Sequence, residues 1–362
     1  MEKDPFKEYI LQKEPQKKEL GLAWYTAIGL QKVDGLDTSK YLNELAQKNI
    51  EGDISTDKVE ELITSYYIEN KEHSIKEEEA DKVSVNITKV LSDKSFVFQV
   101  SQYIDIHKKL FHNVYKHAGK IRDYNITKNE WVLNGDTVMY GGASLIRESL
   151  EYDFNAERNF DYSKINKNEF ISHIARFIAN LWQIHAFCEG NTRTTAVFLI
   201  KYLRKFGYDV TNAIFAENAW YFRNSLVRAN YTNVDKEIFE TTEYLELFLK
   251  NLILNEDNDL KNRYLHIDWK EKVDIDTKKV DIDDEKVDIQ NIGLTSKLKE
   301  NVIKLYNPLK KLECISRKDV VDILKISPSG ASGLISKLLK YKILVPVKNK
   351  GKGKYKFNIK EI

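Results

Sequence analysis

Cysteine and long apolar runs are both scarce in this sequence, and each absence narrows the class of protein. The 362 residues include two cysteines, Cys188 and Cys314, which lie far apart in the chain and suggest no disulfide framework. No apolar run reaches the roughly 18 residues that a transmembrane helix needs. The charged start MEKDPFKEYI lacks the apolar core of a secretion signal. We therefore expect a cytoplasmic protein with no membrane partner.

Positive and negative charges are unevenly distributed along the chain, although the net charge is only +2. Residues 296–362 contain 17 Lys and Arg against 5 Asp and Glu, whereas the rest of the chain contains 40 basic and 50 acidic residues. A basic tail on an acidic body is the pattern expected of an attached nucleic-acid-binding module. A solvated, lysine-rich surface is the alternative interpretation.

Composition and patterning predict a mainly α-helical protein of more than one domain. The hydrophobic content of 42% and the charged content of 31% are typical of a globular chain, and the length indicates two or three domains. Asn134-Gly135 lies between two β-rich runs and predicts a hairpin inside the helical part. The expected domains are an N-terminal helical region at 1–94, a helical domain at 95–254, a charged linker at 255–292 and a winged-helix domain at 293–362.

Capping residues place two short helices in the N-terminal region. Ser39 and Ser55 each precede an apolar helix pattern, and the sequence EGD separates the two patterns. Residues 70–94 are rich in charge and are expected to form a connector. The next helix is expected to run from about residue 100 to Gly119, because apolar residues recur there every three or four positions.

The C-terminal part combines a repeat with a predicted winged helix. Three copies of KVDI recur at a period of seven within residues 255–292, which favours a solvated linker. A helix-turn-helix pattern and a basic hairpin follow it. This arrangement favours DNA as a partner, with protein contact or a homodimer as the alternative. The candidate contacts are Ser327, Ser329, Ser332 and Lys337 around the recognition helix, and Lys348, Lys350, Lys352 and Lys354 on the wing.

The stretch IHAFCEGNTRTTAVF, which begins at residue 184, places a polar corner between two buried helix patterns. The first N–H groups of the second helix have no helical partner, so this corner suits a phosphate, and Gly190 lets the backbone approach it closely. Arg193 adds a forked cation, and Glu189 is placed to ligate Mg²⁺ beside the phosphates. His185 titrates near neutrality and can take a proton from a hydroxyl. The sum predicts phosphoryl or nucleotidyl transfer; a capped helix with a buried histidine is the structural alternative.

The nine residues HAFCEGNTR resemble the motif of the Fic family, H-x-F-x-(D/E)-(A/G)-N-x-R, and the likeness spans roughly residues 95–250. IHKKLFHNVYKHAGKIRDYNI and SLVRAN resemble the flanking helices of that family. The resemblance implies a helical bundle with a β-hairpin flap near Asp136–Gly141, where a target protein docks. It also implies transfer of AMP from ATP, with Mg²⁺, to a protein hydroxyl. The implied roles are His185 as general base, Glu189 as metal ligand, Gly190, Asn191 and Thr192 as anion hole, Arg193 as phosphate clamp and Asn224 as adenosine contact.

Two positions depart from the fuller pattern of the family. Thr192 replaces a glycine that is common in the loop. Ala196 stands where many members have a second arginine, which holds the terminal phosphate. These departures leave the preferred nucleotide open.

The stretch QKNIEG resembles the inhibitory helix of the same family. Glu51 and Gly52 match its pattern, whereas Gln47 replaces a Ser or Thr. We expect Glu51 to approach the site and either to pair with Arg193 or to repel the terminal phosphate. An ordinary helix end at Glu-Gly is the alternative.

Two functions of different classes fit the sequence. The first is a protein AMP-transferase that is inhibited by its own N-terminal helix. The second is a DNA-binding transcriptional regulator whose nucleotide site senses ATP and catalyses little. The intact His185 favours the first function, because sensing needs no base.

Overall fold

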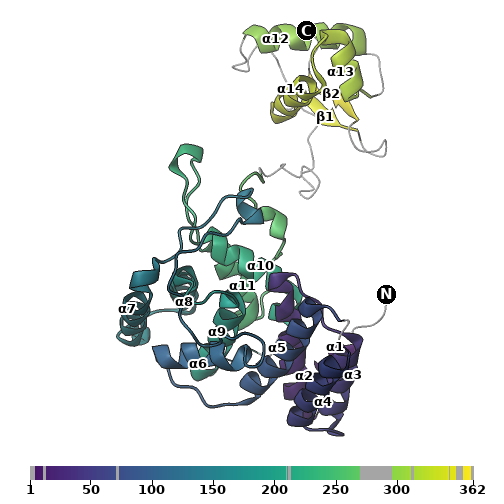
Figure 1. Ribbon diagram of the computed structural model, residues 1–362. Coiled ribbons are helices and arrows are strands. Elements are labelled where there is room, and N and C mark those ends of the chain that lie inside the picture. Colours follow the sequence, from purple (N-terminus) through teal and green to yellow (C-terminus); the bar gives the residue numbers. More distant parts are fainter. Residues whose placement is uncertain are drawn as a thin grey trace. The chain divides into compact units, whose positions relative to one another are not determined.

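The structure is a computed structural model that describes residues 5–10, 14–70, 73–208, 210, 213–269, 296–310, 314–341, 343–347 and 354–359. The chain divides into two compact units, residues 1–273 and 274–362, and each is described by itself (Figure 1). Within the described ranges, no helix is both long enough and apolar enough to span a membrane.

The first unit is built from helices and short 3-10 turns. Its elements are α1 (Pro5–Ile10), α2 (Pro15–Gly29), η1 (Leu30–Asp34), α3 (Lys40–Glu51), α4 (Thr56–Glu69), α5 (Ile75–Ser92), α6 (Val100–Leu110), η2 (Trp131–Leu133), η3 (Ala143–Leu145), α7 (Ile146–Arg158), η4 (Tyr162–Lys164), α8 (Lys167–Ile184), α9 (Asn191–Lys205), α10 (Ile214–Arg228), η5 (Val234–Lys236), α11 (Glu243–Leu254) and η6 (Asn262–Tyr264). The prediction of a mainly helical fold is confirmed.

The centre of this unit is α9, which follows the polar corner of the sequence. Its residues from Asn191 to Leu203 are buried, so the helix has neighbours on every side. The preceding helix α8 begins at a capping box, in which Asn166 and Glu169 each bond the other's backbone N–H. Its buried face packs against α9, α10 and α11, and this packing fixes the loop between α8 and α9.

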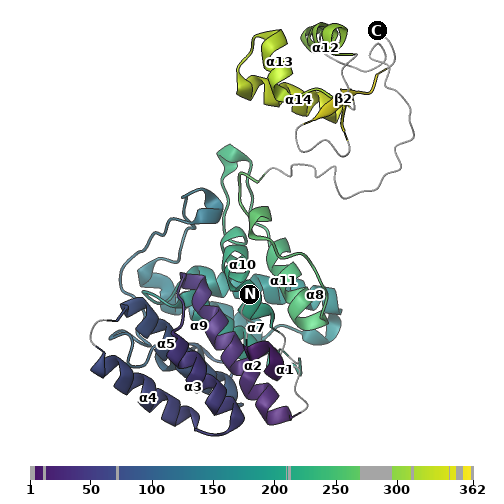
Figure 2. The same ribbon diagram turned by 90° about the vertical axis from the view of Figure 1, so that its right-hand side faces the viewer.

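The N-terminal helices α1 to α4 gather on one side of the unit, around a small core of their own (Figure 2). Ser39 and Ser55 cap α3 and α4 through their hydroxyl oxygens, as the sequence predicts. The expectation of a charged connector at residues 70–94 is wrong. These residues include the long helix α5, whose Val83 and Ile87 enter the large core together with Ala27 of α2. Most charged residues of α5 lie outside the core, but Asp81 is fully buried, where its carboxylate accepts hydrogen bonds from Ser39 and Tyr67.

The helix expected to end at Gly119 is nine residues shorter, because α6 ends at Leu110. The chain then turns through Asn113, which has a φ of 59°, before it reaches Gly119, which has a φ of 75°. Phe111 and Val114 still pack on the core from these turns. The apolar spacing therefore correctly predicts which residues face the core, but it continues past the end of the helix.

The expected β-hairpin around Asn134-Gly135 is also wrong, since residues 123–142 form no strand. Asn134 and Gly135 both have positive φ, but they close the 3-10 turn η2. The extended segment after them bonds to the end of α8, where the N–H of Gly141 donates to the carbonyl of Gln183 at 3.1 Å. Because Val132, Leu133 and Val138 are buried in the core, this loop lies on the helices rather than standing out as a ribbon. We call residues 123–142 the flap loop.

The described residues of the second unit form three helices and a small antiparallel sheet, in the order that the sequence predicts. Its elements are α12 (Ser296–Leu309), α13 (Arg317–Leu324), α14 (Pro328–Lys340), β1 (Leu344–Pro346) and β2 (Tyr355–Phe357). Leu344 pairs with Phe357 in the sheet, and the helices enclose a separate core that includes Val302, Val320 and Leu338. The winged-helix assignment stays a prediction. The KVDI repeats lie outside the described residues.

Candidate functional site

The loop between α8 and α9 closes on itself through backbone and amide contacts. His185 ends α8 in the left-handed conformation, with a φ of 50° and a ψ of 57°, which turns the chain sharply. The side chain of Asn191 spans the loop: its amide nitrogen donates to the carbonyl of Phe187 at 2.7 Å, and its oxygen accepts the N–H of Phe187 at 3.0 Å. The predicted anion-hole residue Asn191 therefore also fixes the shape of the loop.

Position 190 requires glycine for two reasons, the backbone conformation and the lack of space for a side chain. Its φ is 76°, which side-chain-bearing residues seldom adopt, and a Cβ there would lie 2.2 Å from Cζ of Phe111. The helix α9 begins at the next residue, so its first N–H groups face the loop with the positive end of the helix dipole. Thr192 lies in this first turn and accepts a hydrogen bond from Nε1 of Trp182 at 3.0 Å. The geometry of an anion-binding helix start is thus present.

His185 is buried and has no hydrogen-bond partner for either ring nitrogen among the described residues. It is only 3% exposed, and the ring of Tyr140 from the flap loop lies over it with centroids 4.3 Å apart. Burial, followed by the charge of Lys128, lowers the pKa of His185 well below its ordinary value of 6.5. The imidazole is therefore neutral at pH 7, as a general base must be.

Glu189 points outward from the same loop and forms an ion pair with the flap loop. Nζ of Lys128 lies 3.1 Å from its Oε2, and the glutamate side chain is 55% exposed. The backbone carbonyl of Glu189 accepts a hydrogen bond from Nε2 of His107 at 3.0 Å. His107 in turn accepts the N–H of Gly119 at Nδ1, and burial lowers its pKa to about 4, so it acts as a neutral spacer.

A single accessible carboxylate fits the way in which proteins bind Mg²⁺ together with a nucleotide. Mg²⁺ commonly takes one or two carboxylates, and phosphates and water complete its coordination. Within the described residues, no group of three or more His, Cys, Asp or Glu side chains is arranged to hold a metal ion by itself. The donor set at Glu189 therefore suits an ion that arrives with phosphates.

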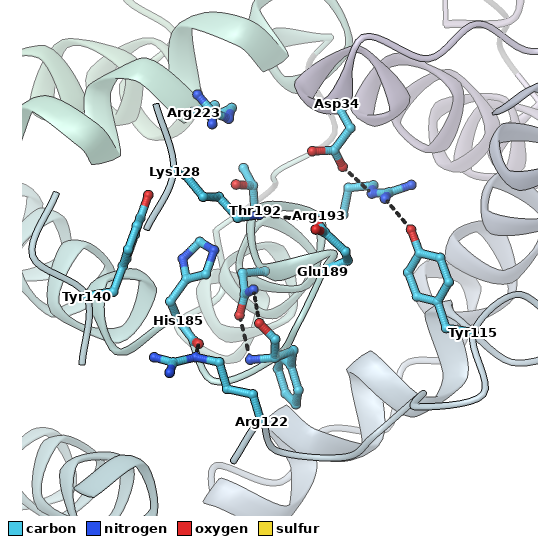
Figure 3. A network of polar contacts seen from close by, with 12 residues as sticks. Asp34, Tyr115, Arg122, Lys128, Tyr140, His185, Glu189, Thr192, Arg193 and Arg223 are labelled. Carbon is cyan, nitrogen blue, oxygen red and sulfur yellow. Dashed lines mark hydrogen bonds and ion pairs between the residues drawn. The ribbon is translucent and has the colours of Figure 1, made fainter. Parts of the chain in front are cut away.

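Arg193 lies on the opposite side of the loop from His185 and is engaged by the N-terminal helices (Figure 3). Its Nε lies 2.8 Å from Oδ2 of Asp34, its Nη1 donates to Gln31 at 2.9 Å, and its Nη2 donates to Glu79 at 2.7 Å. Burial acts to lower the pKa of Arg193, and the nearby charge of Asp34 and Glu79 outweighs it and raises the pKa. The predicted phosphate clamp is 1% exposed; both of its Nη atoms donate hydrogen bonds, whereas Nε makes no hydrogen bond and contacts Asp34 only as an ion pair.

Sequence reasoning missed Arg122, which binds backbone carbonyls at the start of the loop between α8 and α9. This residue is 3% exposed, and its Nε donates to the carbonyl of His185 at 2.7 Å. Its two Nη atoms donate to the carbonyls of Tyr124, Gly141 and Ile184. The guanidinium therefore joins the left-handed histidine to both ends of the flap loop. The sequence KIRDYN contains this arginine among polar residues, so only its burial distinguishes it.

A second buried ion pair was also missed, between Glu130 of the flap loop and Arg223 of α10. Nη1 of Arg223 lies 2.6 Å from Oε2 of Glu130, which is fully buried, and Tyr140 donates to Oε1 at 2.9 Å. This pair positions Tyr140 above His185. The neighbouring Asn224, expected to contact adenosine, is fully buried and donates to Asn262 at 2.7 Å.

The expected pairing of Glu51 with Arg193 is wrong, whereas its repulsion of the terminal phosphate stays a prediction. Glu51 lies at the end of α3, where its Oε2 accepts from Nζ of Lys17 at 2.9 Å. The hydrogen bonds of Lys17, and then of Tyr9, lower the pKa of this carboxyl. Gly52 follows as an ordinary left-handed helix end, with a φ of 92°. Glu51 therefore pairs with Lys17 and not with Arg193, whose acidic partners come from η1 and α5.

The C-terminal candidates lie partly outside the described residues. Lys348, Lys350 and Lys352 fall there, so their place on a wing is untested. Lys337 is exposed on α14, and Lys354 immediately precedes β2. Ser327 caps α14 by accepting the N–H of Gly330 at 3.2 Å. Its hydroxyl oxygen is therefore engaged as the N-terminal cap of α14.

Comparison with known protein families identifies the domain that holds this site. Residues 97–203 match the family model described as the Fic/DOC family, and this range includes His185, Glu189, Arg193 and the flap loop. The chain therefore contains a Fic/DOC domain.

Two curated relatives match over about the same part of the chain. The protein adenylyltransferase VbhT of Bartonella schoenbuchensis is 31% identical over 113 residues, which are 31% of this chain and 22% of the relative. The probable protein adenylyltransferase y4lH of Sinorhizobium fredii is 30% identical over 111 residues, which are 30% of this chain and 55% of the relative. The match thus spans about a fifth of one relative and about half of the other. A solved Fic family protein of Desulfovibrio desulfuricans aligns with 99% of this chain and 91% of its own, at 11% identity and a TM-score of 0.43.

Proposed function

We propose that this protein is an adenylyltransferase that transfers AMP from ATP to a hydroxyl side chain of a protein. The observation that carries the proposal is the juxtaposition of a neutral, unpartnered His185 with a helix start suited to phosphate and an outward carboxylate at Glu189. The two relatives that share this domain are named protein adenylyltransferases, which supports AMP as the transferred group.

The chemistry follows from the roles of these side chains. A ring nitrogen of His185 takes the proton of the target hydroxyl as the hydroxyl oxygen attacks the α-phosphorus. The bond between that phosphorus and the bridging oxygen breaks, and pyrophosphate leaves. The N–H groups at the start of α9 hold the phosphate oxygens in place. Glu189 would hold Mg²⁺, which neutralises phosphate charge when bound.

The target protein is proposed to dock at the flap loop, near Asp136–Gly141. Met139 is 84% exposed there, which offers a target an apolar contact beside the site. The neighbouring Tyr140 covers His185, so a docked target displaces the cover from the base that it needs. No added strand is required for this contact.

We further propose that the N-terminal helices restrain the enzyme through Arg193. Asp34 and Glu79 occupy the guanidinium that a phosphate would otherwise engage. A variant with both Asp34→Asn and Glu79→Gln is expected to bind ATP more tightly and to transfer more AMP than the parent. Glu51→Gln is the matched control, since it removes a carboxylate from the same N-terminal region, but one that pairs with Lys17 and not with Arg193. Equal activity of the double variant and the parent would refute this restraint.

The test of the main proposal uses ATP labelled at the α-phosphate, with Mg²⁺, alone and with cell lysate. Label is expected on protein with the parent and not with His185→Ala. ATP labelled at the γ-phosphate is the parallel arm, because a kinase would transfer that label instead. No protein label in either arm, with ATP binding intact, would favour the rival function of a nucleotide-sensing regulator.

One observation supports the regulator function, and another supports DNA binding. The closed site, with His185 covered and Arg193 sealed, suits a sensor, and the second unit carries an excess of positive charge. We propose that this unit contacts DNA phosphates through lysines such as Lys337 and Lys354. Binding to duplex DNA that weakens steeply with salt would support the contact. Binding that does not change with salt would oppose it.

A further inference from the structure

We infer that Lys128 is the cation that binds the phosphate chain of the nucleotide in the form of the site that the structure describes. This inference rests on the nucleotide-binding function proposed above and deepens it. The flap loop thereby contributes a phosphate ligand as well as a docking surface.

The other positions around the loop from which a cation could reach the phosphates are already engaged or uncharged. Arg193 donates to Gln31 and is paired with two carboxylates. Ala196 is fully buried and offers no charge.

Two further arginines near the loop are equally engaged. The donors of Arg122 are directed at the four backbone carbonyls of His185, Tyr124, Gly141 and Ile184. Both Nη atoms of Arg223 bind the buried Glu130. Each of these arginines can reach a phosphate only by giving up a buried partner, which is costly.

Lys128 itself lies close to Glu189 of the site loop. Its Nζ is 3.1 Å from Oε2 of Glu189, and its charge is among the causes that lower the pKa of His185. The ammonium therefore lies beside the outward carboxylate, on the flap loop that also covers His185. Figure 3 shows Lys128 on the same side of the loop as His185, whereas Arg193 points away toward Asp34 and Tyr115.

The ion pair of Lys128 with Glu189 is easily exchanged for another partner. Its side chain is 29% exposed and that of Glu189 is 55% exposed, so their ion pair lies near water. Such exposed pairs contribute little to stability. An ammonium has three donors, and a triphosphate offers more charge and more acceptors than one carboxylate. When Lys128 turns to a phosphate, Glu189 becomes available as a metal ligand.

The test titrates the full chain with tripolyphosphate, ATP and adenosine in a calorimeter, in EDTA so that no divalent ion contributes. Lys128→Met is compared with the parent, and Lys128→Arg keeps the charge. Lys89→Met is the matched control, because the side chain of Lys89 is similarly exposed at 30% and pairs with Asp57 and Glu60 of α4 instead of a residue of the site. We expect Lys128→Met to bind tripolyphosphate and ATP about 10- to 100-fold more weakly. Adenosine binding should not change, and Lys128→Arg and Lys89→Met should bind like the parent.

Two results would overturn the inference. Equal affinity of Lys128→Met and the parent for tripolyphosphate would mean that Lys128 only neutralises Glu189. Absence of tripolyphosphate binding to the parent would mean that the site lacks a phosphate ligand in this form. Failure of the proposed AMP transfer is a separate outcome. In that case the Lys128-dependent binding persists, but no labelled protein appears.

Discussion

Replacing Gly190 by alanine should destabilise the first unit in two separable ways. The left-handed φ of 76° costs a side-chain-bearing residue about 1–2 kcal/mol. The new Cβ would also lie 2.2 Å from the ring of Phe111, which is fully buried. That ring is held between Tyr115, with centroids 4.9 Å apart, and the guanidinium of Arg193. The overpacking should cost a further ~1–3 kcal/mol, since the ring has little room to move.

Gly52→Ala is the control for the backbone contribution alone. Gly52 has a φ of 92° at the end of α3, and a Cβ there would meet no atom within 4 Å. We therefore expect a loss of about 2–5 kcal/mol for Gly190→Ala and about 1–2 kcal/mol for Gly52→Ala in the free energy of unfolding. Urea denaturation of the full chain, followed by tryptophan fluorescence, measures both. Equal losses in the two variants would refute the proposed clash with Phe111.

Two further predictions concern the base and its support. Arg122→Gln should lower the rate of AMP transfer strongly and the affinity for ATP less. The reason is that the guanidinium holds the carbonyl of His185 and both ends of the flap loop. A loss confined to ATP affinity would contradict this role. The transfer rate should stay level as the pH falls through 6.5, because burial lowers the pKa of His185 and keeps it neutral, and should decline only at lower pH. His185 should likewise contribute stability above about pH 6.5 that is lost below it, since the unfolded chain takes up the proton first. A rate that halves near pH 6.5 would show that the base is not buried during turnover.

The sequence predicted the helical class and the site loop because both depend on local patterns. Ser39, Ser55 and the apolar spacing of α8 and α9 define helices without knowledge of their neighbours. Contacts between distant segments could not be predicted in the same way. The pairing of Arg193 with Asp34 and Glu79 joins residues more than 100 positions apart, and nothing in the local pattern favours those carboxylates over Glu51.

The hairpin prediction failed for a similar reason. Asn134-Gly135 favours a tight turn, but whether the flanking residues pair with each other depends on what else they can bond. In this protein the end of α8 offers the carbonyl of Gln183 to Gly141, and the buried Glu130 of the flap loop pairs with Arg223 of α10. The flap loop thus follows the surface of the bundle. This path brings the half-buried Lys128 to Glu189, a contact that the local sequence does not predict.

The most direct test of the account is the intact mass of proteins modified by the parent chain in the presence of ATP. A mass increase equal to one AMP group, mapped to a Ser, Thr or Tyr hydroxyl and absent with His185→Ala, is the predicted result. An increase equal to a phosphate, or an AMP adduct that persists with His185→Ala, would contradict the assignment of His185 as the base for AMP transfer.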